Sequence, residues 1–274
     1  MEVEPRDFVF NAHGLVSLDI KSDIATIVLQ NPSRHNCLTI DFLEQFLACI
    51  TTANKYQGLT AIVLKAQGKS FSTGGDVSAF YEHYDTIEAY SHQIVGLLNQ
   101  CISQMLRGST PIITRVQGPV TGGSFGFILA SDLVVMADSA FFAPYYVEVG
   151  FAPDGGWTAI LPDRIGEQRA KSVQLLNTHI EPELALTWGL VDRIAPTQML
   201  DVHIDEWIST LRAKVTHDEP ITKHNIMDET RILHYEEKLE QERTAFINAI
   251  VKPETKMGME KFLRALKKKH EVTP

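Results

Sequence analysis

Residues 145–157 read YYVEVGFAPDGGW and place one carboxylate, Asp154, in a turn rich in proline and glycine. An apolar run that suits a strand precedes this turn. Glycine has no side chain, so a backbone segment or a ligand can approach the turn closely. Between Phe151 and Trp157, we expect the Asp154 carboxylate to lose part of its hydration, which would raise its pKa as an acid/base group requires. A plain surface turn is the alternative interpretation of this segment taken alone.

Two upstream segments share one plan: a strand, a glycine pair and the start of a helix. The first is FSTGGDV, residues 71–77, which follows an apolar run at 61–64. The second is GPVTGGSFGF, residues 118–127, which follows PIITRV at 111–116. Backbone N–H groups at such junctions lack a helical acceptor, and the helix dipole adds positive potential. Two of these N–H groups converging on one carbonyl oxygen would form an oxyanion hole.

The order and spacing of the three segments resemble the crotonase superfamily of enoyl-CoA hydratases and isomerases. The resemblance begins at NPSRHNCL, residues 31–38, which looks like the family's early CoA-binding segment. It continues through AxxWGLVD at 185–192 and the helical stretch 242–268. It implies an α/β protein with a crotonase-like ββα spiral core over residues 1–196 and a C-terminal helical oligomerisation region over 197–274. The fold hosts many reactions on CoA thioesters, so the resemblance specifies the reaction less closely.

Hydrophobic patterning predicts the elements around these segments. Alternation predicts a hairpin over residues 15–29, and one-sided apolar spacing predicts helices over 40–53 and 87–105. Short β-branched runs predict strands buried on both faces and linked by helical crossovers; these runs are 61–65, 111–116 and 132–136. Beyond Pro196 the chain is expected to be helical, with loops around Glu219–Pro220 and Lys252–Pro253.

Composition restricts the kinds of partner. The chain has 274 residues, a net charge of −9, 44% hydrophobic and 22% charged residues, values typical of a globular protein. The acidic balance argues against a nucleic-acid partner and against an anionic membrane surface. No apolar run is long enough to span a bilayer. The three cysteines lack metal-like or CxxC spacing and no signal peptide is apparent, so we expect reduced thiols, no metal site and a cytoplasmic location.

The resemblance assigns the catalytic positions one by one. The family's two oxyanion donors fall on the backbone N–H groups of Gly75 and Gly123, where a larger side chain would obstruct the thioester. A typical hydratase carries two glutamates that handle the water and the α-proton. These two positions hold Gly126 and Tyr146 in this chain. Hydration then lacks its paired acid and base groups, which argues against a conventional hydratase.

Asp154 falls where several enoyl-CoA isomerases carry a single acid, eight residues beyond the second glutamate position. One base suffices to move a double bond from the 3,4 to the 2,3 position. We therefore expect a 3-enoyl-CoA to 2-enoyl-CoA isomerase with Asp154 as the base, in fatty-acid or aromatic-acid catabolism. Tyr146 either hydrogen-bonds near the dienolate or lines the pocket. Glu148, on the same face as Tyr146 if the segment is a regular strand, is either a second acid or an exposed glutamate.

Related enzymes leave alternatives open. The 3-hydroxyisobutyryl-CoA hydrolases have an Asp in a similar F-P-D-x-G turn, but they keep an acid at the Tyr146 position and are longer. The 4-chlorobenzoyl-CoA dehalogenases use an Asp there as nucleophile, with Trp at the Tyr146 position. Their active-site His has no obvious match, and His83 and His92 are the nearest candidates. An enoyl-CoA hydratase-like protein and a non-catalytic acyl-CoA-binding homologue are further alternatives.

The resemblance also assigns contacts to the substrate, whose CoA enters as part of the thioester, so no separate cofactor is expected. These contacts are Arg34, His35, Cys37, Ser72, Thr73, Gly74, Asp76, Val77, Gly122, Pro153 and Phe262. Aromatic side chains suit either an acyl pocket or the core; they are Phe80, Tyr81, Tyr84 and Trp157. The run Lys267–Lys269 is either a solvated tail or a contact to CoA phosphates. The apolar face of the C-terminal helices, together with the resemblance, predicts a homotrimer or a dimer of trimers.

Overall fold

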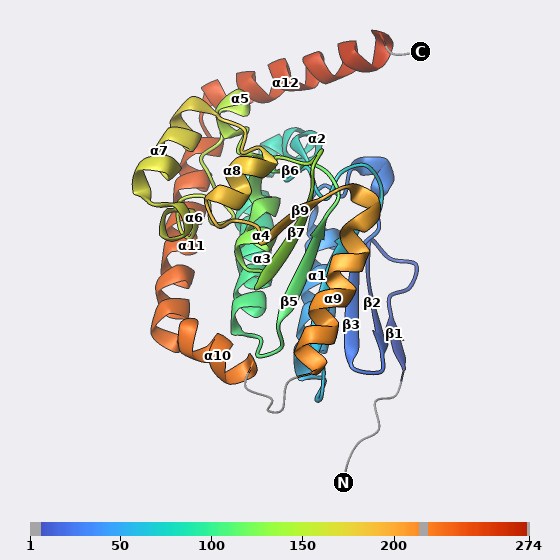
Figure 1. Cartoon of the computed structure of the whole chain (residues 1–274). Coiled ribbons are helices and arrows are strands. Elements are labelled where there is room, and N and C mark those ends of the chain that lie inside the picture. The colour runs from blue at the N-terminus through green and yellow to red at the C-terminus, as the bar shows by residue number, and fades with distance from the viewer. Residues whose placement is uncertain (1–6, 214–218, 273–274) are drawn as a thin grey trace.

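The centre of the molecule is a seven-stranded sheet with the strand order β1-β2-β3-β4-β5-β7-β9 (Figure 1). The computed structural model describes residues 7–213 and 219–272. β1, β2 and β3 are antiparallel neighbours, and the pairs from β3 to β9 are parallel. The strands are β1 (Phe8–Phe10), β2 (Val16–Lys21), β3 (Ile24–Leu29), β4 (Ala61–Ala66), β5 (Ile112–Val116), β7 (Leu133–Ala137) and β9 (Arg193–Ala195).

The predicted hairpin and buried strands are confirmed. β2 and β3 pair from Val16 opposite Leu29 to Lys21 opposite Ile24. Ser22, with φ +55°, takes the left-handed conformation in the turn between them. β4, β5 and β7 are adjacent parallel strands whose residues are mostly buried. Their β-branched composition fits strands covered on both faces.

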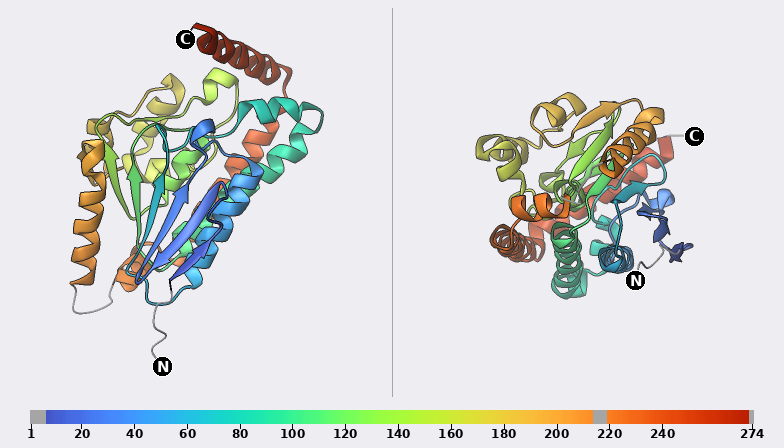
Figure 2. Two further views of the ribbon diagram at one scale, coloured as in Figure 1. Left: turned by 90° about the vertical axis from the view of Figure 1, so that its right-hand side faces the viewer. Right: turned by 60° about the horizontal axis from the view of Figure 1, so that its bottom comes forward.

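Helices cover both faces of the sheet (Figure 2). α1 (Ile40–Lys55) packs on β2 and on α3 (Ile87–Arg107), whereas α9 (Leu200–Arg212) packs on β5 and β7 from the other face. The Thr39 hydroxyl caps α1 by accepting a hydrogen bond from the Phe42 N–H at 3.2 Å. The helices predicted over 40–53 and 87–105 are therefore confirmed, each with a short extension at its end.

Short elements at the carboxyl ends of the central strands carry the glycine segments. α2 (Val77–Glu82) follows the first glycine pair. The second pair lies between β6 (Val120–Thr121) and α4 (Phe125–Leu129), within the 3-10 helix η3 (Gly122–Ser124). β6 pairs in parallel with β8 (Phe142–Ala143) in a separate two-stranded sheet. Both glycine pairs thus lie beyond the carboxyl ends of the central strands of the main sheet.

The prediction that a strand carries Tyr146 and Glu148 is wrong. The segment forms the short helix α5 (Tyr146–Val149). Left-handed residues bound it on both sides, Tyr145 at φ +58° and Gly150 at φ +83°. Side chains two residues apart do not share a face in a helix, so Glu148 is not brought beside Tyr146 by a strand repeat.

After α9, the described part of the C-terminal region continues with α10 (Glu219–Ile226), α11 (Glu229–Ile250) and α12 (Pro253–Val272). α11 runs along α3, and α12 contacts α2 and α5 before it projects past the body (Figure 1). The predicted loop around Lys252–Pro253 is confirmed by the break between α11 and α12. The loop predicted around Glu219–Pro220 is wrong, because α10 begins at Glu219. The Lys267–Lys269 side chains lie outside the described residues.

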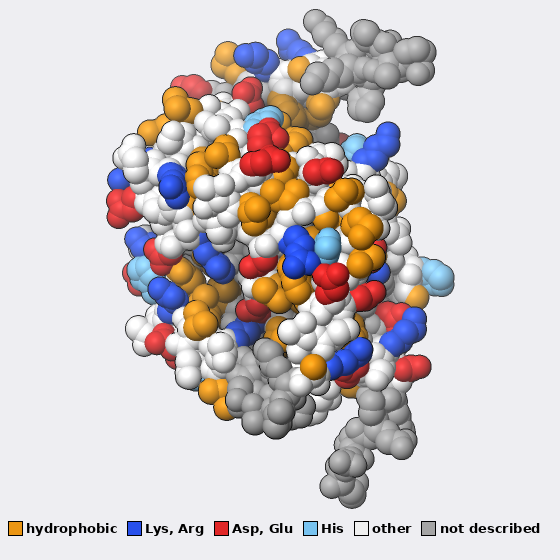
Figure 3. All heavy atoms as spheres, in the orientation of Figure 1, with side chains coloured by type: hydrophobic (Ala, Val, Ile, Leu, Met, Phe, Trp, Pro, Cys, Tyr) orange, Lys and Arg blue, Asp and Glu red, His pale blue; other side chains and the backbone are white. Residues whose placement is uncertain are grey.

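The remaining elements are short and complete the outer layer. They are η1 (Pro32–Arg34), η2 (Tyr84–Thr86), α6 (Leu161–Ile165), α7 (Glu167–Leu176), α8 (Pro182–Thr187) and η4 (Thr197–Met199). The region boundary at Pro196 stays a prediction; α9, which follows it, packs on the sheet. The face covered by α8 and α9 exposes hydrophobic side chains among charged ones (Figure 3), and those on α8, η4 and α9 are Leu184, Leu186, Met199 and Val202. Among the described helices, none combines the length and the hydrophobicity needed to cross a membrane.

Candidate active site

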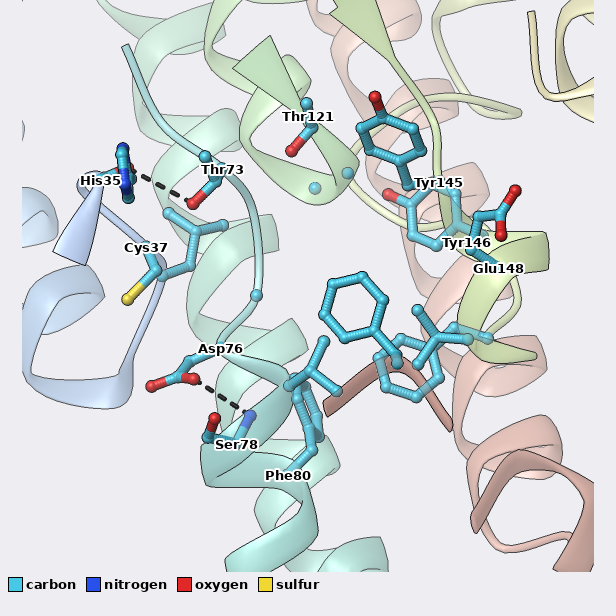
Figure 4. A pocket seen from close by; sticks show the side chains of 18 of the residues that line it. His35, Cys37, Thr73, Asp76, Ser78, Phe80, Thr121, Tyr145, Tyr146 and Glu148 are labelled. Atoms are coloured by element: carbon cyan, nitrogen blue, oxygen red, sulfur yellow. Dashed lines mark hydrogen bonds between the residues drawn. The ribbon is translucent and has the colours of Figure 1, made fainter. Parts of the chain in front are cut away.

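A largely apolar cavity of about 850 Å³ lies where the three glycine-containing segments meet. Gly75, Gly123 and Asp154, one from each segment, all line it. Further walls come from the early segment around Arg34, from α1, and from α2, α3, α5, α11 and α12. Figure 4 shows the cavity with the early segment on one side and Tyr145 and Tyr146 on the other. Segments that are distant in the sequence are therefore brought to one site.

The backbone at Gly75 is oriented by a bridge to Leu38. In this bridge the Leu38 N–H donates to the Gly74 carbonyl at 2.8 Å, and the Asp76 N–H donates to the Leu38 carbonyl at 3.3 Å. The Gly74 carbonyl and the Gly75 N–H belong to one planar trans peptide group, in which the C=O and the N–H point in opposite directions. The bridge therefore uses the groups flanking Gly75 and directs the Gly75 N–H to the other side.

The second predicted donor, the Gly123 N–H, lies at the start of η3. Gly123 is the second residue of this helix, where backbone N–H groups have no helical acceptor. The Trp157 indole N–H donates to the Gly122 carbonyl at 2.8 Å and so fixes the preceding peptide. A Cβ at Gly74 would lie 2.6 Å from the Thr121 carbonyl oxygen, so only glycine lets the two loops pack this closely.

Asp154 is the carboxylate at the centre of the site. Its residue is only 8% exposed, and a Cβ on Gly123 would lie 2.8 Å from its Oδ1. Burial raises the pKa of Asp154 from 3.8 to about 6, and the hydrogen bond from Tyr146 opposes this rise. A pKa near 6 leaves the carboxylate mostly ionised at neutral pH while keeping it basic. The Asp154 carboxylate, expected from the sequence to be an acid/base group, is thus desolvated and adjacent to Gly123, the second predicted oxyanion donor.

Tyr146 is the direct partner of this carboxylate. Its hydroxyl donates to Asp154 Oδ1 at 2.6 Å and lies 3.0 Å from the Asp154 carbonyl oxygen. Burial, with the Asp154 charge nearby, raises the pKa of Tyr146 well above its ordinary value of 10.0. The hydroxyl therefore stays protonated and acts as a donor. In Figure 4 the Tyr146 hydroxyl points away from α5 and toward the cavity.

The packing at Gly126 leaves no room for the first hydratase glutamate. Gly126 is buried in α4, and a Cβ there would lie 2.4 Å from Ile102 Cδ1 and 2.7 Å from the Gly155 carbonyl oxygen. Ile102 can rotate away, but a backbone carbonyl cannot. Any side chain at this position would therefore displace the turn that carries Asp154.

Sequence reasoning missed Glu242 of α11, which holds this same turn. The residue is 4% exposed, and its carboxylate accepts hydrogen bonds from the N–H groups of Gly156, Thr158 and Ala159. A signal was present in the sequence: Tyr235, Leu239, Phe246 and Ile250, all buried in α11, repeat at helical spacing and form an apolar face. Glu242 falls on that face by helical spacing. A charged residue on a buried face marks a site that needs an explanation.

The early segment forms the polar rim. Arg34 pairs with Asp76, which also accepts the Ser78 N–H at 3.1 Å and so caps α2. His35 Nδ1 lies 3.0 Å from the Ser70 hydroxyl. Burial raises the pKa of the Cys37 thiol to about 11, so it stays protonated. This rim supplies one guanidinium that is 56% exposed and faces solvent.

Most of the predicted substrate contacts line the cavity, namely Arg34, His35, Cys37, Thr73, Asp76, Val77, Gly122 and Phe262. Three are not brought to its surface. Ser72 is fully buried and donates its hydroxyl to the Asn36 carbonyl at 2.7 Å. Gly74 allows the loop contact described above, and Pro153 sits in the turn before Asp154. These three shape the loops.

The other candidates divide between cavity and scaffold. Phe80 lines the cavity, whereas Trp157 is fully buried beneath it. Tyr81 bonds Glu260 of α12, and Tyr84 lies under the Lys256 ammonium. Glu148 is exposed at the rim and accepts a hydrogen bond from Asn177 at 3.1 Å. The two histidine candidates do not line the cavity: His83 stacks on Tyr90, and His92 is exposed on α3.

Comparison with known proteins identifies a matching sequence family and solved structures with a similar fold. The sequence model described as enoyl-CoA hydratase/isomerase matches residues 19–272. An enoyl-CoA hydratase structure from Bacillus halodurans superposes with a TM-score of 0.84 at 22% identity, covering 90% of this chain and 99% of that one. The crotonase-like α/β fold predicted from the sequence is thereby confirmed.

Two relatives of known name carry different activities. A 4-chlorobenzoyl coenzyme A dehalogenase from Arthrobacter sp is 28% identical over 226 residues, 80% of this chain and 79% of the relative. A trans-2-decenoyl-[acyl-carrier-protein] isomerase from Streptococcus mutans is 28% identical over 195 residues, 71% of this chain and 74% of the relative. Relatives at this level of identity catalyse more than one reaction, so the reaction of this chain has to be inferred from the geometry of its site.

Proposed function

Because the chain belongs to the enoyl-CoA hydratase/isomerase family, we propose that it is an enoyl-CoA isomerase that converts 3-enoyl-CoA to 2-enoyl-CoA thioesters. One observation carries the proposal: the buried carboxylate of Asp154 lies against Gly123, the second proposed oxyanion donor, while the two hydratase acid positions hold Gly126 and Tyr146. A 1,3-proton shift needs one base, whereas hydration needs acid and base groups for water and proton together.

In the proposed mechanism, the thioester carbonyl oxygen accepts hydrogen bonds from the Gly75 and Gly123 N–H groups. This stabilises the negative charge that develops on oxygen when the C2 proton leaves. The Asp154 carboxylate takes that proton and forms a neutral acid, and the electron pair spreads over the dienolate. Asp154 then returns the proton to C4, the double bond moves to the 2,3 position, and the carboxylate is regenerated.

Tyr146 supports this base in the proposal. Its hydroxyl engages Oδ1 of Asp154, so we assign the proton transfer to Oδ2. The donated hydrogen bond stabilises the ionised form and opposes the effect of burial on the pKa. Tyr146 thus orients the carboxylate and keeps it available near neutral pH.

The acyl chain is proposed to lie against an aromatic cluster. Phe80, Phe151 and Phe246 all line the cavity, with ring centroids 5.2–5.7 Å apart. Such a wall favours an apolar acyl group and excludes water from the dienolate. No cofactor beyond the CoA of the substrate takes part in the proposal.

A second candidate is an acyl-CoA hydrolase that uses the same oxyanion hole. The similarity to the dehalogenase favours nucleophilic or water-activating use of Asp154. The raised pKa of Asp154 suits a proton acceptor. Among the described residues, His35 is the histidine that lines the cavity, and it lies at the rim. The isomerase is therefore the proposal that the site supports better.

A panel of 3-enoyl-CoA thioesters tests the proposal. An isomerase produces the conjugated 2-enoyl thioester, which absorbs in the ultraviolet, and exchanges the C2 proton with solvent deuterium. A hydrolase instead releases free CoA thiol, and a protein that only binds acyl-CoA does neither. Thiol release without conjugation would replace the isomerase by the second candidate.

A further inference from the structure

Glu242 connects the C-terminal helical region to the turn that carries Asp154. Its Oε2 accepts the Gly156 N–H at 2.8 Å. Its Oε1 accepts the N–H groups of Thr158 at 2.6 Å and Ala159 at 2.9 Å, and the Thr158 hydroxyl at 2.7 Å. Four donors from one short segment therefore converge on one buried carboxylate of α11.

The turn that Glu242 holds has a conformation that needs outside support. Gly155 and Gly156 have φ values of +64° and +91°, which glycine alone adopts readily. The backbone N–H groups that follow point into a buried region, where an unpaired donor costs roughly 1–3 kcal/mol. The Glu242 carboxylate satisfies three such groups at once, so the turn keeps one conformation.

This turn also sets the distance between the base and the oxyanion hole. A Cβ at Gly155 would lie 2.3 Å from the Gly123 carbonyl oxygen, so the two backbones are in direct contact. Asp154 immediately precedes this contact. A shift of the turn would therefore move Asp154 relative to the Gly123 N–H.

We propose that Glu242 is a positioning residue, whose carboxylate fixes the turn 155–159 and thereby places Asp154 against Gly123 for proton transfer. This inference rests on the proposed isomerase function for its kinetic consequence, but not for its structural one. Burial raises the pKa of Glu242 to about 7, and the hydrogen bonds from Thr158 and Gly156 oppose this rise by stabilising the carboxylate.

Glu242→Gln is the informative variant because it is nearly isosteric. Its Oε1 can still accept from Thr158 and Ala159, but its NH₂ group would face the Gly156 N–H, donor against donor. Glu236→Gln is the matched control on the same helix. Glu236 binds Arg107 and Ser103, away from the turn, so this control removes a polar contact of α11 without touching Asp154. Glu242→Asp keeps the charge but draws the carboxylate back, and it serves if the Gln variant does not fold.

Amide hydrogen exchange of the 154–160 segment tests the structural half without any substrate. Among the Gly156, Thr158 and Ala159 amides, we expect that of Gly156 to exchange roughly 10-fold faster or more in Glu242→Gln, because the Gln side chain no longer accepts its hydrogen bond. The control should match the wild type at these amides. Unchanged exchange in a folded Glu242→Gln or Glu242→Asp protein would overturn the inference.

Steady-state kinetics test the catalytic half. Misplacing the base should lower kcat roughly 10- to 100-fold while KM for the acyl-CoA stays within about twofold. Glu242→Asp should recover part of the loss, and Glu236→Gln should retain wild-type kcat. Faster exchange at the turn with unchanged kcat would show that Glu242 is merely structural. A wild type without isomerase activity would sink the proposed function, and the exchange result would still decide whether Glu242 holds the turn.

Discussion

Replacing Tyr146 by Phe should change the pH dependence of isomerisation more than its maximum rate. The change removes the hydroxyl that donates to Asp154 Oδ1 at 2.6 Å and keeps the ring that packs in the cavity wall. That hydrogen bond lowers the pKa of Asp154 against the effect of burial. Its removal therefore raises the pKa of Asp154 above about 6, and the base becomes ionised only at higher pH.

The magnitude follows from the energy of a hydrogen bond to a charged group, roughly 1.5–3 kcal/mol. At about 1.4 kcal/mol for each pKa unit, the midpoint should move up by roughly 1–2 units. With the pKa of Asp154 at about 6, the wild-type rate should rise through a midpoint near pH 6 to a plateau. The variant should rise through a midpoint between about 7 and 8, and it should approach the same plateau above that.

The assay is the pH–rate profile of 3-enoyl-CoA isomerisation, recorded as conjugated product from about pH 5 to 9. At pH 6 the variant should be roughly 5- to 50-fold slower than the wild type, with the difference closing at high pH. Tyr145→Phe is a matched control, because Tyr145 lines the cavity without bonding Asp154. An unshifted midpoint in Tyr146→Phe would refute the assignment of Tyr146 as donor to the catalytic base.

Three further predictions concern the stability of the fold, hydration and the assembly. Asp154→Asn should stabilise the fold above about pH 7 by up to about 3 kcal/mol, because the pKa of Asp154 is about 6 in the folded protein against an ordinary 3.8. The wild type has this stability at low pH and loses it as the pH rises through 6. Equal urea midpoints for the two proteins at pH 8 would contradict the burial argument. Hydration of crotonyl-CoA should be negligible, and Gly126→Glu should not restore it because the side chain would meet the Gly155 carbonyl; hydratase turnover in either protein would overturn the site assignment. Light scattering at micromolar concentration should give a trimer or a dimer of trimers. Such an assembly would cover the exposed apolar side chains on α8 and α9. A monomer would exclude this proposal.

The sheet and the long helices were predictable because their signals are local. β4 and β7 are short apolar runs, typical of strands buried on both faces, and α1 and α3 show continuous helical spacing. The short helix α5 was not predictable, because four residues are too few to show a period. Its boundaries are set by the left-handed conformations of Tyr145 and Gly150.

In the site, too, residues within short motifs were predictable, whereas roles that depend on contacts distant in the sequence were not. Asp154 and the glycines Gly75 and Gly123 were found because each lies within a short motif. Glu242 was missed because its partners are more than eighty residues away in sequence, and its role depends on how α11 packs. The environment at Gly126 likewise becomes visible only when Ile102 and the Asp154 turn are seen to meet there.

The Asp154→Asn variant tests the central claim most directly when its isomerase activity and its acyl-CoA binding are measured together. The change removes the proton acceptor, leaves the Gly75 and Gly123 donors in place and keeps an oxygen that Tyr146 can bond. We predict that kcat for the 3-enoyl to 2-enoyl conversion falls by roughly two to four orders of magnitude, while acyl-CoA affinity changes little. A folded variant that binds acyl-CoA and keeps most of its isomerase activity would contradict the one-base mechanism.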